Sequence, residues 1–240
     1  TFTLEGTEGM RARTEEGDLI TCFDIVLDEN GCLKSYKQIG ENDTAVGTKW
    51  YAYFDYTAKR TWFNNESYVD TLSKSAMDKF IDITYEAYDK TCGEDFGDLV
   101  PSIFTDEPQV ARKGKMAYAT DTEDVTLPWT NDFAETFEAA YGEDVIAGIP
   151  ELFWELPDGK ISTIRYHYHD HACERFTDAL ARTLGNWCEA NGLALTGHMM
   201  KEPTLSSQCS AVGEAMRSLS AFQLPGIDML ADRYELTTAK

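Results

Sequence analysis

The stretch that decides the predicted fold runs from Val100 to Pro108 and reads VPSIFTDEP. A short apolar run, Leu99–Phe104, ends abruptly at two carboxylates, Asp106 and Glu107. About four to eight apolar residues bounded by turn-forming residues are typical of a strand that is buried on both faces. Because Pro108 has no N–H group to donate to a sheet, we expect the strand to end where the carboxylates begin.

Two later segments repeat this pattern of an apolar strand that becomes polar at its end. Residues 193–200 form an apolar run that includes His198 and is followed by Lys201-Glu202-Pro203. Residues 225–230 form a third run, which contains Asp228. Apolar strands that alternate with helices are typical of parallel βαβ units. No glycine-rich nucleotide-binding loop opens any of the helices, which favours a barrel over a nucleotide-binding sheet.

The beginning of the chain has a different pattern. Residues 18–27 and 32–36 have strand-forming sequences, and the intervening Asp28–Gly31 contains an Asn-Gly pair that favours a tight hairpin turn. We therefore expect an α/β protein with a small N-terminal antiparallel β subdomain or insertion over residues 1–48. A partial or complete (β/α)8 TIM-type barrel would occupy residues 49–240.

Four segments are expected to be helical, and one of them runs from about Leu205 to Leu219 and leads to the third apolar run. A helix is expected to begin after Ser73, a residue type that caps helix N-termini, and to end at Gly93. A shorter helix is expected over residues 132–141, and a long one over residues 161–190. The pair Asn191-Gly192 would end the long helix in the left-handed conformation.

The composition excludes some classes of partner. A net charge of −21 repels phosphate groups, so we expect no nucleic-acid partner and no anionic membrane partner. No apolar run is long enough to span a bilayer. The charge suits an enzyme with a neutral substrate, and we expect a cytoplasmic location. The N-terminus resembles neither a signal peptide nor a natural start, and so we expect a fragment whose partners include the remaining domains of a longer chain.

The six cysteines have no CxxC pair and no metal-type spacing. Scattered thiols in helical patterns are usually small buried apolar residues, and we favour reduced thiols. A disulfide between Cys22 and Cys32, which flank the expected hairpin, is the alternative.

Two glutamates are the predicted catalytic residues. Glu107 and Glu202 each end a buried strand and precede a proline, and in a parallel barrel both would lie at the same mouth. A pair of carboxylates across a pocket is the apparatus of glycoside hydrolysis, in which one donates a proton and the other activates water or attacks the sugar. His198 could hydrogen-bond a sugar hydroxyl or hold a carboxylate, and a structural histidine is the alternative.

Further residues are candidates for contacts with a carbohydrate substrate. The segment 61–70 is irregular, polar and aromatic, and such segments can line a sugar pocket through ring stacking and amide hydrogen bonds. Its aromatic residues could equally anchor the loop to the core. The candidate substrate-binding residues are Asp106, His198, Trp62, Asn64, Tyr68, Asp70 and Asp228.

The histidine-rich segment His167–His171 does not predict a metal site. On a helix His167 and His171 share a face, but His169 does not, and the HExxH pattern is absent because Tyr168 occupies the position of the glutamate. We expect a polar helix face here and no resident metal.

Taken as a set, four pieces of sequence resemble barrel glycoside hydrolases, most closely the α-L-rhamnosidase type and its uncharacterised bacterial relatives. The pieces are Tyr68–Leu72, Ile103–Pro108, Trp187–His198 and Pro225–Asp228. The resemblance covers roughly Trp50 to the C-terminus. It implies a (β/α)8 catalytic domain within a larger multidomain protein.

The resemblance also implies residue roles. Glu107 matches the position of the general acid, and Glu202 matches the second carboxylate, which would act as the base of an inverting reaction. In many related barrels the second carboxylate lies on a later strand, beyond residue 240. Rhamnosidase-like enzymes can use calcium, for which Asp70, Asp106 and Asp228 could supply oxygen ligands.

Two other functions stay open at this point. A carbohydrate-binding barrel without catalytic activity would keep the aromatic residues. It would hold the carboxylates of Glu107 and Glu202 far apart or in ion pairs with Lys or Arg. In a metal-dependent sugar isomerase or epimerase, the acidic side chains and His198 would instead converge on a divalent ion.

Overall fold

The computed structural model describes residues 1–6, 17–111 and 113–228. The chain divides into two compact units, each built from two segments of sequence. The first unit comprises Thr1–Tyr68 and Lys113–Tyr168, and the second comprises Val69–Arg112 and His169–Lys240. This division differs from the one expected after residue 48. In the described part of the chain, no helix is both long enough and apolar enough to cross a membrane.

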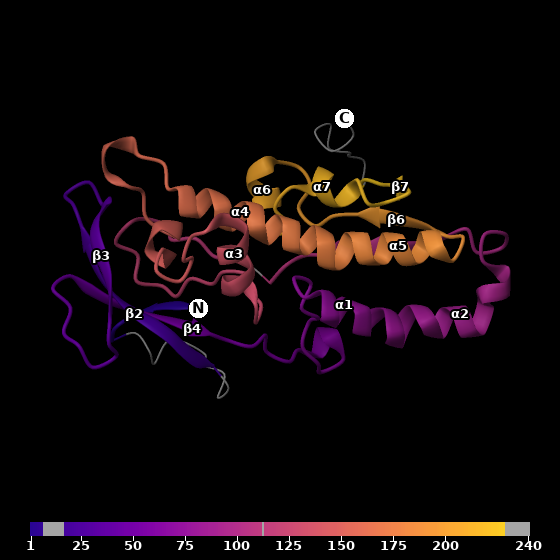
Figure 1. Ribbon diagram of the computed structural model, residues 1–240, viewed down its shortest axis with the longest axis horizontal. Helices are drawn as coiled ribbons and strands as arrows, with labels where there is room; N and C mark the ends of the chain where they lie inside the picture. Colours follow the sequence, from indigo (N-terminus) through magenta and orange to yellow (C-terminus); the bar gives the residue numbers. More distant parts are fainter. Residues whose placement is uncertain (7–16, 112, 229–240) are drawn as a thin grey trace. The chain divides into compact units, whose positions relative to one another are not determined.

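The first unit contains an antiparallel sheet in the order β1-β4-β2-β3 (Figure 1). Its strands are β1 (Phe2–Leu4), β2 (Asp18–Leu27), β3 (Leu33–Ile39) and β4 (Thr48–Phe54). The hairpin expected around Asp28–Gly31 is present, because β2 pairs with β3 in antiparallel register. Asp28 accepts the backbone N–H groups of Asn30 and Cys32, and Gly31 adopts a φ of +79°, which an L side chain would disfavour.

Aromatic side chains build the core of the first unit. The ring of Phe2 on β1 stacks on Trp50 of β4 with the centroids 4.9 Å apart, and Trp154 packs edge-on against Trp50. Phe2 also exchanges backbone hydrogen bonds with Val125, which ties the second segment of the unit to the sheet. The middle of β4 is buried on both faces, since the consecutive residues Lys49–Ala52 are all buried.

The rest of the first unit consists of short helical elements and loops. These elements are η1 (Thr61–Phe63), α3 (Phe133–Tyr141), η4 (Ile149–Leu152) and η5 (Pro157–Gly159). The helix expected over residues 132–141 is therefore confirmed as α3, and it ends at Gly142 with a φ of +68°. Tyr168, which is fully buried, donates its hydroxyl to the carbonyl of Pro128.

Helices dominate the second unit. The elements are α1 (Lys74–Phe80), a π-helical turn (Ile81–Tyr85), α2 (Glu86–Cys92), η3 (Gly93–Asp95), α4 (Thr163–Phe176), a π-helical turn (Thr177–Arg182), α5 (Thr183–Ala190), α6 (Leu205–Cys209) and α7 (Ala215–Leu219). The first residues of α4 belong to the first unit. Both predicted long helices are confirmed, whereas the single helix expected from Leu205 to Leu219 is two short helices, α6 and α7. Ser73 caps α1 by accepting the N–H of Ala76. Helices α4 and α5 continue one another through the π-helical turn (Figure 1).

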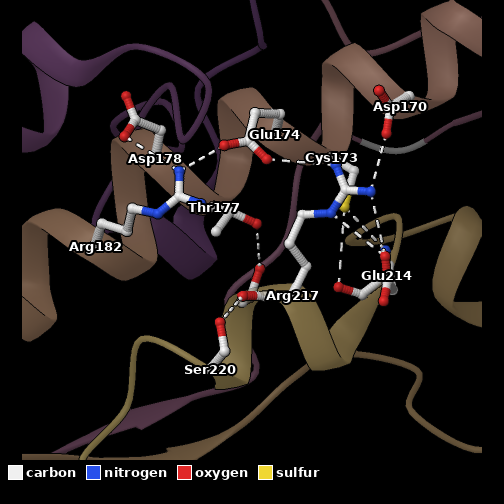
Figure 2. A network of polar contacts seen from close by, with 10 residues as sticks. Asp170, Cys173, Glu174, Thr177, Asp178, Arg182, Glu214, Arg217 and Ser220 are labelled. Atoms are coloured by element: carbon white, nitrogen blue, oxygen red, sulfur yellow. Dashed lines mark hydrogen bonds and ion pairs between the residues drawn. The ribbon is translucent and has the colours of Figure 1, made fainter.

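A polar network fixes α7 against α4 and its π-helical extension (Figure 2). Arg217 donates to Asp170 at 2.9 Å and to Glu174 at 3.4 Å. Beside it, the Cys173 sulfur accepts the N–H of Glu214 at 3.1 Å, and burial raises the pKa of this thiol. All six cysteines are free thiols in the described residues. The network sets where the chain leaves α7 to enter the next strand.

The second unit also holds a parallel sheet in the order β5-β6-β7. Its strands are β5 (Ser102–Asp106), β6 (Ala194–His198) and β7 (Leu224–Pro225). The three expected parallel strands are present, but each is shorter than the apolar run that predicted it. Met229 and Leu230 of the third run lie outside the described residues.

The predicted (β/α)8 TIM-type barrel is wrong. The described residues form an antiparallel four-stranded sheet and a separate parallel three-stranded sheet, with no closure into a barrel. β4 lies almost entirely within the range expected for the barrel but pairs with β1 and β2. After β5 the chain returns to the first unit instead of adding a strand.

One face of the parallel sheet is open in the second unit. Phe104, Thr196 and Leu224 lie opposite one another across the three strands, and the side chains of Phe104 and Leu224 are more than half exposed. Leu195, on the other face of β6, is fully buried. Because side chains alternate along a strand, Asp106 and His198 belong to the same open face as Phe104.

Candidate functional site

Three residues that follow or end the parallel strands form a compact polar cluster. Glu107 follows β5, His198 ends β6, and Asp228 follows β7 after two residues. Each offers one ligand atom, a carboxylate oxygen or a ring nitrogen, and these atoms all lie within 4.8 Å of one another. We call this group the strand-end cluster. Parallel strands bring their carboxyl ends to one edge, which is why residues so distant in sequence meet here.

The backbone at Glu107 departs from the β conformation at the point where the strand ends. Glu107 has a φ of +47°, a left-handed conformation that is rare for residues other than glycine. Such a conformation costs on the order of 1–3 kcal/mol and persists where the surrounding structure holds it. Glu107 is half-buried, and buried Pro108 follows it.

His198 is the buried member of the cluster, with 8% of its surface exposed. Its Nε2 lies 3.2 Å from Oδ1 of Asp106, and the ring of Phe104 packs edge-on against the imidazole at 5.6 Å. The other ring nitrogen, Nδ1, is buried and has no hydrogen-bond partner among the described residues. A proton on Nε2 would face the carboxylate of Asp106, and the neutral imidazole would then carry its lone pair on Nδ1.

Glu202 lies beneath the strand ends and is 4% exposed. Its Oε1 accepts the N–H of Met199 at 2.7 Å, and its Oε2 lies 3.4 Å from the N–H of Asp228, at the long end of a hydrogen bond. Its backbone carbonyl accepts the side-chain amide of Gln208. The Glu202 carboxylate therefore joins the end of β6 to the segment that carries Asp228.

Replacing Glu202 by alanine is expected to destabilise the protein by about 1–3 kcal/mol, because the buried N–H of Met199 loses its acceptor. The E202Q variant keeps one acceptor oxygen and should lose less. Urea unfolding followed by circular dichroism measures both. Equal stability of E202A and the parent protein would show that this carboxylate does not brace the strand ends.

A glycine just before His198 is a site residue that the sequence analysis did not single out. Gly197 has a φ of +133°, and a Cβ atom placed there would lie 1.9 Å from the carbonyl oxygen of Thr105. Its own carbonyl accepts the N–H of Gly226. A glycine inside a strand is the available sequence signal, since it often marks a close backbone approach.

The aromatic and amide residues proposed to bind substrate belong to the first unit, whereas the strand-end cluster belongs to the second. Trp62 lies on η1 and is 88% exposed, and Asn64 ends η1 in the left-handed conformation. The ring of Tyr68 packs on Phe63 with the centroids 5.1 Å apart. Their contacts with a substrate stay predictions.

The three aspartates proposed for calcium have different surroundings. Asp228 belongs to the strand-end cluster, Asp106 contacts His198, and Oδ1 of Asp70 accepts the N–H of Leu72 ahead of α1. Calcium takes about six to eight oxygen ligands. The cluster, with a buried imidazole and two carboxylates, is a mixed nitrogen and oxygen donor set that does not fit this preference.

The histidine-rich segment on α4 has its own local contacts. Nδ1 of His167 lies 2.7 Å from Oε2 of Glu143, and its ring stacks on Tyr141 with the centroids 4.3 Å apart. His171 is buried. The His167 contact belongs to the first unit and is separate in sequence from the strand-end cluster.

Comparisons with known proteins find a structural likeness and no sequence relative. No family model matches the chain, and no curated protein matches it. The chain is similar to the solved structure of a rhamnosidase from Novosphingobium sp. PP1Y, at 16% sequence identity and a TM-score of 0.46. The match covers 82% of this chain and 17% of the rhamnosidase chain. This chain thus spans less than a fifth of that protein, and the likeness assigns no activity.

Proposed function

We propose that the strand-end cluster is the acid–base centre of a glycoside hydrolase. Glu107 is the general acid that gives its proton to the leaving oxygen, and Asp228 is the carboxylate that acts at the sugar carbon. The observation that supports the proposal is the approach of these two carboxylates, one oxygen of each lying within 4.8 Å of the other at the carboxyl-terminal edge of the parallel strands.

The short separation favours one stereochemical outcome. Retaining glycosidases hold their two carboxyl groups about 5–5.5 Å apart, whereas inverting enzymes need about 6.5–9.5 Å to admit a water molecule. One oxygen of Glu107 and one of Asp228 lie within 4.8 Å of one another, which favours the shorter spacing over the longer one. In this proposal Asp228 attacks the sugar, and Glu107 then serves as the base that activates water. Asp228 thus replaces Glu202, whose carboxylate already accepts backbone N–H groups.

Residues around the pair support a carbohydrate substrate. Phe104 exposes 60% of its surface on the open sheet face and packs against His198, so that its ring can stack on the apolar face of a sugar. The exposed carboxylate of Asp106 can accept hydrogen bonds from sugar hydroxyls. An α-L-rhamnoside is the first substrate to test, because of the sequence resemblance.

The alternative of an inactive binding module is less well supported. That alternative expects Glu107 and Glu202 to be far apart or in ion pairs with Lys or Arg. Within the described ranges, neither Glu107 nor Glu202 forms an ion pair with a lysine or an arginine, and Glu107 meets Asp228 closely.

The test is hydrolysis of a panel of aryl glycosides, including an α-L-rhamnoside, by the full chain in the presence of a chelator. The anomer released first is identified by NMR, and retention is expected. D228N should remove activity, while D98N, which alters an exposed carboxylate ahead of β5, should not. If the chain hydrolysed none of the substrates, the proposal would be refuted. If the product had the inverted anomeric configuration, another residue, such as Glu202, would supply the second catalytic carboxylate.

A further inference from the structure

The donor set of the strand-end cluster suits a ligand other than a sugar. Two carboxylates and one imidazole converge, and their donor atoms lie within 4.8 Å of one another. Ligand atoms around one ion are separated by about one and a half times the metal–ligand distance of about 2.0–2.2 Å. Modest side-chain rotations would therefore bring the three groups onto a single ion.

His198 supplies an independent observation that points to a ligand. Its side chain is buried and its Nδ1 has no hydrogen-bond partner among the residues that the structure describes. A buried polar atom without a partner costs about 1–3 kcal/mol, and native proteins rarely keep one without a reason. An ion bound at Nδ1 removes this cost.

The contact between Asp106 and Nε2 prepares the imidazole for such an ion. The carboxylate oxygen lies 3.2 Å from Nε2, which favours a proton on that nitrogen and a lone pair on Nδ1. Histidines that bind metals regularly donate their other N–H to a carboxylate or a carbonyl in this way. Phe104 packs against the ring and further limits its rotation.

We propose that Glu107, His198 and Asp228 form a binding site for a first-row transition-metal cation of the Zn²⁺ type. Imidazole favours zinc and its neighbours in the first row over calcium and magnesium, which prefer all-oxygen sites. Three protein ligands leave a coordination position open, as in zinc sites that bind a further molecule.

The ion would regulate the activity proposed above, and this consequence rests on the proposed function. A Glu107 carboxylate that coordinates a cation cannot give a proton to a leaving oxygen, and a coordinated Asp228 cannot attack a sugar. Bound Zn²⁺ is therefore an inhibitor of glycoside hydrolysis at this site. The binding itself does not depend on the hydrolytic activity.

The direct test is titration of the metal-free full chain with ZnCl₂ by isothermal calorimetry, without substrate. Saturable binding is expected, tighter for Zn²⁺ than for Ca²⁺ or Mg²⁺. D106N, which changes an exposed side chain and should leave the fold intact, is expected to weaken Zn²⁺ binding about 10–100-fold. H198A should lose more, and circular dichroism establishes that it folds.

The matched control is H167A, which removes another histidine that contacts a carboxylate. This variant should bind Zn²⁺ as the parent protein does. Loss of binding in H167A, unchanged binding in D106N, tighter binding of Ca²⁺, or no Zn²⁺ binding would each overturn the proposal. Zn²⁺ binding is measured without substrate, and hydrolysis is measured in the presence of a chelator. If the chain proves not to hydrolyse glycosides, the result on Zn²⁺ binding is therefore unaffected.

Discussion

The E107Q variant is expected to hydrolyse an alkyl glycoside about 10²–10⁴-fold more slowly than the parent protein, the range that a general acid contributes. Glutamine preserves the shape of Glu107 but has no proton to give to the leaving oxygen. The alkoxide that departs from an alkyl glycoside is a strong base, and its departure depends on this proton. Values of kcat/KM for an alkyl glycoside and a nitrophenyl glycoside of the same sugar measure the effect, because they report the first step and not the later hydrolysis in which Glu107 acts as the base.

The comparison of leaving groups separates acid catalysis from a general loss of structure. A nitrophenolate leaves without protonation, so E107Q should lose much less activity on the nitrophenyl substrate than on the alkyl substrate. If both substrates lost activity equally, Glu107 would act in binding or folding and not as the acid. E94Q, a change of an acid on η3 outside the strand-end cluster, serves as the control and should keep full activity on both substrates.

The largest loss of stability is expected from G197A, at more than about 3 kcal/mol. A Cβ atom at this position would lie 1.9 Å from the Thr105 carbonyl oxygen, and the neighbour it meets is backbone that pairs β5 with β6. The φ of +133° is in addition unfavourable for alanine. Since His198 follows directly, the same change should displace the strand-end cluster. Urea unfolding followed by circular dichroism gives the free energy of unfolding.

G192A is the matched control for this prediction. Gly192 also has a positive φ, +72°, but a Cβ atom there would meet nothing within 4 Å. Alanine at Gly192 therefore suffers only the backbone cost of the left-handed conformation, about 1–2 kcal/mol. If G197A and G192A were destabilised by the same amount, the close approach of β5 and β6 would not be the reason that position 197 requires glycine.

Local patterns predicted the elements of this protein well. Ser73 predicted the start of α1, and Asn191-Gly192 predicted the end of α5, because helix caps depend on residues within one turn. The hairpin at Asp28–Gly31 followed from turn chemistry in the same way. The polar residues that end two apolar runs, and Asp228 within the third, also make Glu107, His198 and Asp228 candidates from the sequence alone.

Only the tertiary structure decided how these elements pair and which acids meet. Whether β4 joins a barrel or an antiparallel sheet depends on partners such as Phe2 and Phe23, far away in sequence, and no local pattern encodes that choice. Glu202 follows one apolar run and Asp228 lies within another. Backbone N–H groups contact the carboxylate of Glu202, whereas an oxygen of Asp228 lies within 4.8 Å of one of Glu107. The sequence alone determined which residues stand at strand ends, because strand and turn preferences are local. The register of β5, β6 and β7 determined which of them share a site, because pairing is set by long-range packing.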